Sequence, residues 1–407
     1  MKRNTRKGFT GIELVIVIAI IAILATALIP AFGGLFDSAN KTADIQMAKN
    51  LNTALLLHNI NSEVNDFADV LAAARAEGYL ISKLNPTSKG CYLVWESESN
   101  QFLLVDAEAN FEVLFAADPN YSSDSANWHF VTSDLDAIKQ LETAGYSVAR
   151  AATTTSGLAA LVAQGGTQTI YIDESIEMDA NNIAFTKEGY DITLNLGESN
   201  VSSNGTLDGA PIFAKTAGKL TVIGGTLSCN GMEESEHGSF ACSIGYEPGA
   251  NLVIEGVTFT GITGINGTWK GSGAVQIAVS DSTFDVSKNG VIVAAGSPEG
   301  VATITKCHIN AGQYAIFGSQ GAKITVDGGT YKGGKAVIYS NTTADGASLI
   351  TINSGEFDGK FEVTNSSNIV INGGTFSNTG LTLEAFKAYV AAGKTVTENA
   401  DGAYVVQ

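Results

Sequence analysis

Arginine is scarce in this 407-residue chain and occurs only at Arg3, Arg6, Arg75 and Arg150. Acidic residues outnumber basic ones by 41 to 23, which gives a formal net charge of −18. Nucleic-acid binding needs clustered Lys and Arg opposite the phosphates, so we expect no nucleic-acid partner. Acidity of this kind is typical of an exposed, soluble surface.

Proline is also rare, with 6 residues, whereas glycine is abundant, with 45. Many glycines with few prolines suit tight turns between strands and argue against a polyproline or flexible linker. The chain is 44% hydrophobic and only 16% charged, which is typical of a folded protein. Its length predicts two or more domains.

Cysteine occurs four times, at Cys91, Cys229, Cys242 and Cys307, and never in a CxxC or other zinc-ligand spacing. We therefore predict no metal site. Cys229 and Cys242 flank one loop and are candidates for a disulfide outside the cell. The alternative is that the thiols are free, buried and act as small hydrophobic groups.

A long apolar run follows a basic leader at the N-terminus. Residues 14–36 contain no charged residue, and about 20 such residues suffice to cross a bilayer as a helix. The leader cations Lys2, Arg3, Arg6 and Lys7 are expected to stay cytoplasmic, which places the bulk of the chain outside the cell. Beyond the run, apolar residues continue at helical spacing, so we predict one helix over residues 9–58.

A cleaved secretory signal peptide is the alternative for this segment. Ala25, Thr26 and Ala27 resemble a small-residue cleavage site behind an apolar core. Against it, Glu13 lies at the mouth of the apolar run, where an unpaired carboxylate is costly and therefore functional. The helical pattern also continues past the cleavage site to His58, and a removed peptide has no need of that continuation.

The segment Lys7-Gly8-Phe9-Thr10-Gly11-Ile12-Glu13-Leu14 resembles the processing site of type IV prepilins and pseudopilins. The resemblance implies that residues 1–8 are a leader, which a prepilin peptidase removes between Gly8 and Phe9 before Phe9 is methylated. It makes Glu13 the fifth residue of the mature chain. It also places Pro30 where pilin helices commonly carry a proline.

This resemblance implies a mode of assembly. The new amine at Phe9 would lie in an apolar bundle, where Glu13 of a neighbouring subunit neutralises it, because a paired charge costs less than a lone one. Pro30 removes a helical N–H group and loosens the helix. The implied partners are other pilin subunits, and the implied location is first the membrane and then a surface pilus or secretion pseudopilus. No cofactor is implied.

Residues 59–150 alternate helix-like and strand-like stretches, and we predict a small α+β domain. The resemblance implies that such a sheet packs on the exposed half of a pilin helix. The expected helices are 67–77 and 134–144, and the expected strands are 91–95 and 102–105.

The C-terminal half repeats one pattern of alternating β-formers that ends in a glycine-rich turn. A period of about 20 to 30 residues predicts a β-solenoid, because propeller blades take about 40 or more. A second strand is expected in each coil, for example at 212–214, 315–317 and 337–339. The copies lie at 220–226, 252–258, 277–283, 302–308, 324–330, 350–356 and 369–375.

Covers are expected at both ends of the solenoid, since a bare end exposes unpaired strands. A short apolar helix at 156–164 precedes the first strand, and a helix at 381–390 is followed by a hairpin across Asp401 and Gly402. The arrangement resembles the right-handed parallel β-helix of pectate-lyase-like proteins. The predicted fold is therefore a long N-terminal helix with a small α+β domain, then an all-β parallel β-helix over 151–378 with a cap over 379–407.

An enzyme is not expected. Lyases of the resembled fold use an Arg or Lys base with carboxylates that hold calcium, yet no arginine follows Arg150. A hydrolase needs facing carboxylates, and we interpret the available aspartates as residues that form turns. No histidine has a partner at a recognisable catalytic spacing. These aspartates are Asp281, Asp285, Asp327 and Asp358, and the histidines are His58, His129, His237 and His308.

Ligand binding is expected of the solenoid. Trp269, on a glycine-rich insertion, and the loop aromatic Tyr246 are candidates for stacking on a sugar or a protein, the alternative being that they pack against the solenoid wall. We expect a minor pilin or pseudopilin that displays this domain, because a bulky solenoid on every subunit would hinder close packing. The alternatives are a surface-anchored polysaccharide lyase or hydrolase and a structural filament subunit without a ligand.

Overall fold

The structure is a computed structural model that describes residues 11–58, 67–122, 125–172, 174–178, 182–203, 210–230, 241–267, 273–294, 300–340, 342–343 and 346–407. The chain forms two compact units. The first, here called the helix unit, extends to Val148 without Ser133–Leu135. The second, here called the solenoid unit, consists of Ser133–Leu135 and Ala149–Gln407.

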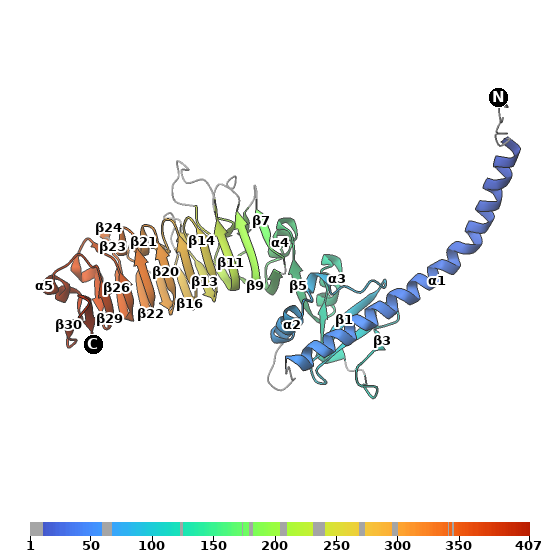
Figure 1. Cartoon of the computed structure of the whole chain (residues 1–407), viewed down its shortest axis with the longest axis horizontal. Coiled ribbons are helices and arrows are strands. Elements are labelled where there is room, and N and C mark those ends of the chain that lie inside the picture. Colours follow the sequence, from blue (N-terminus) through green and yellow to red (C-terminus); the bar gives the residue numbers. More distant parts are fainter. Residues whose placement is uncertain are drawn as a thin grey trace, which may run out of the picture. The chain divides into compact units, whose positions relative to one another are not determined.

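The helix unit is built on α1 (Gly11–Leu57), a single helix of 47 residues. It confirms the predicted helix over the described residues. In its second half, Ala48, Leu51, Ala54 and Leu55 recur at intervals of three, three and one, so they share one buried face. This part of α1 packs on strands β2 (Gln101–Asp106) and β3 (Glu112–Phe115) and on helix α2 (Phe67–Ala76) (Figure 1).

An antiparallel sheet with the strand order β3–β2–β1–β4 packs against α1. Both predicted strands are confirmed as β1 and β2, and both predicted helices as α2 and α3, whereas β3 and β4 were not expected. Leu141 of α3 joins a core cluster with Trp128 and Phe130. The elements are α2 (Phe67–Ala76), β1 (Cys91–Glu96), β2 (Gln101–Asp106), β3 (Glu112–Phe115), β4 (Trp128–Val131) and α3 (Leu135–Thr143), with 3-10 turns at Ile81–Lys83 and Ser125–Asn127.

The solenoid unit is a parallel β-solenoid whose coils have three faces (Figure 1). The first face contains β5 (Ser147–Ala152), β6 (Thr167–Ile172), β13 (Ala250–Glu255), β16 (Gln276–Ser280), β19 (Val301–Thr305), β28 (Ile369–Ile371) and the first halves of β9 (Tyr190–Ser203), β11 (Gly218–Cys229), β22 (Lys323–Gly333) and β26 (Leu349–Asp358).

The second face contains the second halves of those four long strands together with β7 (Ile176–Met178), β14 (Thr258–Gly261), β17 (Thr283–Val286), β20 (His308–Ala311) and β29 (Gly374–Ser377). The third face is an eight-stranded parallel sheet of β8 (Ile183–Phe185), β10 (Ile212–Ala214), β12 (Ile244–Tyr246), β15 (Ile265–Gly267), β18 (Val291–Ala294), β21 (Tyr314–Ser319), β23 (Ala336–Ser340) and β27 (Phe361–Val363). A short hairpin, β24 (Thr342–Thr343) and β25 (Gly346–Ala347), follows β23.

Glycine makes the corner between the first two faces. Gly224 and Gly225 both have φ of 65°, and Gly328 and Gly329 have φ of 71° and 92°, in the left-handed region that favours glycine. A Cβ atom at Gly225 would lie 2.4 Å from Cβ of Leu196 in the preceding coil. The predicted glycine-rich turn is therefore a bend inside a continuous strand in β9, β11, β22 and β26, and in the other coils it separates two strands. Each coil runs through three faces, whereas the sequence pattern indicated two strands.

Inward side chains form ladders from coil to coil, as expected of a solenoid. An aromatic stack runs behind the second face: the ring centroids are 4.3 Å apart for Phe259 and Phe284, 4.7 Å for Tyr331 and Phe357, and 5.0 Å for Phe357 and Phe376. Aliphatic side chains fill the space behind the first face. One of their ladders consists of Leu220, Leu252, Ile277, Ala302, Ile324, Ile350 and Ile369, all at most 3% exposed.

The N-terminal cover is confirmed as α4 (Thr155–Val162), which begins where Oγ1 of Thr154 accepts a hydrogen bond from the N–H of Gly157. At the other end, the predicted helix is shorter, with α5 at Leu383–Phe386 and a 3-10 turn at Lys387–Tyr389. The predicted hairpin is confirmed as β30 (Val396–Glu398) and β31 (Tyr404–Val406). Strand β31 pairs with β29 antiparallel, whereas the coils pair parallel.

Candidate functional site

The predicted processing and assembly residues lie largely beyond what the structure describes. Gly8 and Phe9 are outside the described residues. Glu13 and Pro30 fall within α1, but their side chains are not described. No helix among the described residues is both long and apolar enough to cross a membrane, so the predicted membrane span is not confirmed.

Apolar side chains cover the first half of α1 and are exposed in the single chain. Ile12 is 75% exposed, and Leu35 and Phe36 are 65% and 66% exposed. Exposed apolar surface of this size marks a site of interaction, because water is a poor solvent for it. This half of α1 therefore needs an apolar environment or partner.

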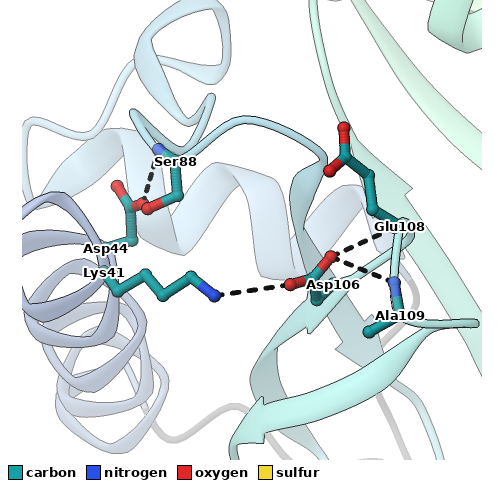
Figure 2. A network of polar contacts seen from close by, with 6 residues as sticks. All are labelled: Lys41, Asp44, Ser88, Asp106, Glu108 and Ala109. Carbon is teal, nitrogen blue, oxygen red and sulfur yellow. Dashed lines mark hydrogen bonds and ion pairs between the residues drawn. The ribbon is translucent and has the colours of Figure 1, made fainter. Parts of the chain in front are cut away.

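The second half of α1 is instead fixed to its own unit by polar side chains (Figure 2). Asp44, which is 1% exposed, accepts hydrogen bonds from the N–H groups of Thr87 at 2.7 Å and Ser88 at 2.9 Å. Lys41 Nζ lies 3.5 Å from a carboxylate oxygen of Asp106. The other Asp106 oxygen accepts from the N–H groups of Glu108 and Ala109, which closes the β2–β3 turn.

Asn52 attaches the second half of α1 to strand β2 at a further point. Its Nδ2 donates to the carbonyl of Phe102 at 2.9 Å, and its Oδ1 accepts from the N–H of the same residue at 2.8 Å. The side-chain amide thus pairs with β2 as a neighbouring strand would. The two halves of α1 consequently differ: one is exposed and apolar, and the other is held on the sheet.

Two of the predicted solenoid sites need correction. Tyr246 is fully buried on β12 and its hydroxyl donates to the carbonyl of Ile292 at 3.0 Å, so it cannot stack on a ligand. Gly267 in the next coil leaves room for its ring, since a Cβ atom there would lie 2.3 Å from it. Cys229 and Cys242 are both buried, burial raises the pKa of the Cys242 thiol, and the suggested disulfide is not formed in the part of the chain that the structure describes. Trp269 lies outside the described residues.

A shallow groove of about 610 Å³ lies on the second face of the solenoid. Because alternate residues of a strand point to opposite sides, each coil contributes two outward side chains to it and buries the residue between them. The first row consists of Thr283, His308, Thr330, Glu356 and Thr375, and the second row of Asp285, Asn310, Lys332, Asp358 and Ser377.

Hydrogen bonds run along the rows from one coil to the next. In the first row, Nδ1 of His308 lies 2.7 Å from Oγ1 of Thr330. In the second row, Asn310 Nδ2 donates to Asp285 at 2.9 Å. The strands space these side chains regularly, and hydrogen bonds to neighbouring coils hold them in place. The groove is therefore a preorganised set of donors and acceptors.

Asp358 is the most firmly held carboxylate of the groove. Its Oδ1 accepts from Ser377 Oγ at 3.2 Å and from Asn378 Nδ2 at 2.6 Å, and its other oxygen lies 4.0 Å from Lys332 Nζ. Glu356 lies two residues away on the same strand, and no hydrogen bond or ion pair engages it among the described residues. The Asp358 carboxylate thus has its partners within the protein, whereas the Glu356 carboxylate is available to a ligand.

The interpretation of the aspartates as turn residues is correct for one of them and wrong for two. Asp281 has φ of 48° and makes a turn. Asp285 and Asp358 instead lie on β17 and β26 and face the groove. The sequence signal was present as a polar–apolar–polar triplet directly after each corner, which appears in the chain as Thr283-Phe284-Asp285, His308-Ile309-Asn310, Thr330-Tyr331-Lys332, Glu356-Phe357-Asp358 and Thr375-Phe376-Ser377.

Comparison with known proteins places the N-terminus in a family. Residues 3–29 match the family model of the prokaryotic N-terminal methylation motif. Over 115 residues the chain is 32% identical to the type IV wide pilus major component PilA4 of Thermus thermophilus, an alignment that covers 82% of that protein and 28% of this chain. No solved structure matches the chain significantly.

Proposed function

This chain belongs to the type IV pilins, and we propose that it is a minor pilin or pseudopilin that displays a glycan-binding β-solenoid at the cell surface. The methylation motif and the exposed apolar half of α1 support assembly through the N-terminal helix. Most of the solenoid unit lies outside that alignment, since the alignment spans only 115 residues, or 28% of the chain. The additional domain supports a role in display.

The processing part of the proposal follows the family. A prepilin peptidase cleaves between Gly8 and Phe9, Phe9 is methylated, and the helix holds the chain in the membrane until other pilin subunits take up its apolar face. Glu13 neutralises the new amine of a neighbouring subunit, because an unpaired charge is costly in an apolar bundle. The bulk of the chain then lies outside the cell.

The groove on the second face is the observation that supports glycan binding. A sugar chain offers hydroxyl groups at short, regular intervals, and the groove offers polar side chains at the strand spacing of about 4.8 Å. Thr330, Asn310 and Ser377 provide neutral donors and acceptors, and the buried aromatic rings between the rows leave hydrogen bonding as the mode of recognition. Stacking on Tyr246, which the sequence suggested, is not part of this proposal.

The test is retention of the full-length chain, in detergent, on immobilised neutral oligosaccharides. The double variant His308→Ala/Asn310→Ala removes two groove side chains, and we expect about tenfold weaker retention, since a hydrogen bond contributes about 1 kcal/mol. Asn372→Ala is the control, because Asn372 bonds to Asn353 at the corner between the first two faces and neither residue lines the groove. Equal binding by the double variant, or no retention on any glycan, contradicts the proposal.

A polysaccharide hydrolase is the second candidate, and one observation favours it. Glu356 and Asp358 project into the groove from positions two apart on β26, which puts their Cα atoms about 6.6 Å apart. A hydrolase needs two carboxylates on one binding face, and these two side chains share the outward side of β26. We nevertheless propose binding without turnover, because Asp358 is already held by two donors and Lys332. Release of new reducing ends that is lost in Glu356→Gln would favour the enzyme.

A further inference from the structure

Charge is distributed unevenly in the groove. Asp285, Glu356 and Asp358 face a single permanent cation, Lys332. The Lys332 ammonium lies beside Asp358, its register partner on β26. Glu356 lies two residues before Asp358 on the same strand. One hydrogen bond from Asn310 Nδ2 engages an oxygen of Asp285. The groove is therefore acidic, and among the described residues Glu356 is its carboxylate without a side-chain partner.

The surroundings of Glu356 complete a binding position. In the first row its register neighbours are Thr330 on β22 and Thr375 on β29, each about 4.8 Å away along the solenoid. Two hydroxyl groups thus flank one free carboxylate. Such a set can accept three hydrogen bonds from an ammonium group, or bind an ammonium and the hydroxyls beside it, since Thr both donates and accepts.

From this arrangement we infer that the groove selects glycans that carry free amino groups, and that Glu356 binds the ammonium. The inference rests on the proposed function and names its ligand class. Acidic glycans are repelled in two ways. The net charge of −18 repels them at a distance when the salt concentration is low, and the Glu356 carboxylate repels them inside the groove. Neutral glycans bind through the hydroxyl and amide side chains alone.

A basic peptide is the other cationic polymer, and the groove suits it less. Peptides bind as an added strand at an exposed sheet edge with side-chain pockets, or as a helix or polyproline segment in an apolar or aromatic groove. The groove lies on the face of a sheet whose strands are paired on both sides, and Phe284, Tyr331 and Phe357 fill the space beneath it. Hydroxyl-rich chains need neither an edge nor deep pockets.

The experiment compares three soluble oligomers of equal length, made of glucosamine, N-acetylglucosamine or galacturonate, by calorimetry with the full-length chain in detergent. We expect the glucosamine oligomer to bind about fivefold more tightly than the acetylated one at low salt, the size of effect typical of an exposed ion pair. Added salt at about 0.5 M should remove most of this preference by screening. The galacturonate oligomer should bind most weakly.

Three variants locate the effect. Glu356→Gln should abolish the preference for the amine while binding of the acetylated oligomer persists, and Glu356→Asp should retain part of the preference. Glu398→Gln, on exposed β30 and outside the groove, is the charge-matched control and should behave as the parent chain. Because Glu356 is exposed, none of these changes threatens the fold.

The outcomes separate the two proposals. Binding of neutral oligomers without any preference for the amine overturns this inference and leaves the proposed function standing. Absence of binding to every oligomer overturns the proposed function itself. A preference that survives in Glu356→Gln, or tighter binding of a short oligolysine than of the glucosamine oligomer, overturns Glu356 as the glycan ammonium site.

Discussion

The helix unit and the solenoid unit achieve order in different ways. In the helix unit, a few unlike polar contacts, such as Asp44 with Thr87 and Ser88, fix one long helix to an antiparallel sheet. In the solenoid unit, like residues meet in every coil, as in the stack of Tyr331, Phe357 and Phe376. Single contacts are thus decisive in the first unit, and repetition is decisive in the second.

In the solenoid, stability and recognition therefore depend on different side chains of the same strands. Its inward ladders need only apolar residues of suitable size, so the outward side chains of the same strands are free to vary. The second face uses that freedom to place His308, Asn310, Lys332 and Glu356 in one groove. In the helix unit, by contrast, the polar residues Asp44 and Asn52 are occupied in holding the helix.

The largest effect is expected from Phe357→Ala. This side chain is 2% exposed and stacks on rings in both neighbouring coils, so its removal leaves a cavity that costs about 3 to 5 kcal/mol. Because each coil contacts only its neighbours, the loss should appear in β22, β26 and β29 first. Hydrogen–deuterium exchange of the full-length chain, resolved by peptide, measures this.

Thr375→Ala, on the outward side of β29, is the control for Phe357→Ala. It should change stability by less than about 0.5 kcal/mol. Faster exchange throughout the helix unit after Phe357→Ala would show that the two regions do not differ in the way described above.

A smaller loss, of about 2 to 4 kcal/mol, is expected from Asp44→Ala in the helix unit. The change removes two charge-assisted hydrogen bonds and leaves the N–H groups of Thr87 and Ser88 without their acceptor. Exchange should increase in the second half of α1 and around residues 87–88, while the solenoid stays protected. Asp44→Asn keeps one acceptor oxygen and should lose less than Asp44→Ala; an Asp44→Asn variant as stable as the parent chain would refute the role of the carboxylate.

The smallest effect is a pH dependence of the stability of the helix unit through His129. Burial between Phe67 and Trp95 lowers the pKa of His129, against the opposing effect of Glu96. The folded state therefore binds fewer protons than the unfolded one, whose histidine pKa is about 6.5, and stability falls as pH drops below that value. The slope is at most one proton, about 1.4 kcal/mol per pH unit.

His129→Gln removes this contribution. Denaturation of the parent chain and the variant at several values between pH 7 and 5 should give curves whose difference grows on acidification, with the parent losing more. Parallel curves would show that His129 binds a proton equally in both states.

Much of the fold could be predicted from sequence because it follows from local and repeated patterns. Helical spacing of apolar residues gave α1, and the recurring Gly-Gly segments gave the solenoid and its corners. Strands β3 and β4 were missed because they are only four residues long and their pairing depends on β1 and β2, which lie elsewhere in the chain. Pairing of this kind is set by tertiary packing and not by local propensity.

The candidate site was harder to predict than the fold. Tyr246 looked like a loop residue, but its burial depends on Gly267 in the next coil, which the local sequence of Tyr246 does not contain. The groove arises only when register aligns Thr330 with Glu356 and Lys332 with Asp358, residues separated by 26 positions. An aspartate followed by glycine, as in Asp358-Gly359, has the same local sequence whether it forms a turn or ends a strand, so Asp358 was misinterpreted.

The reversal of direction at β31 has a consequence for crowding. Every coil presents a parallel edge onto which the next coil adds, and an uncovered edge of this kind would accept a strand from any neighbouring molecule. Antiparallel β31, held in the hairpin with β30, occupies that edge on β29, and Tyr404 ties it down through a hydrogen bond to the carbonyl of Leu381. Strand addition at this end of the second face is therefore blocked, which limits end-to-end association of one copy with the next at high local concentration.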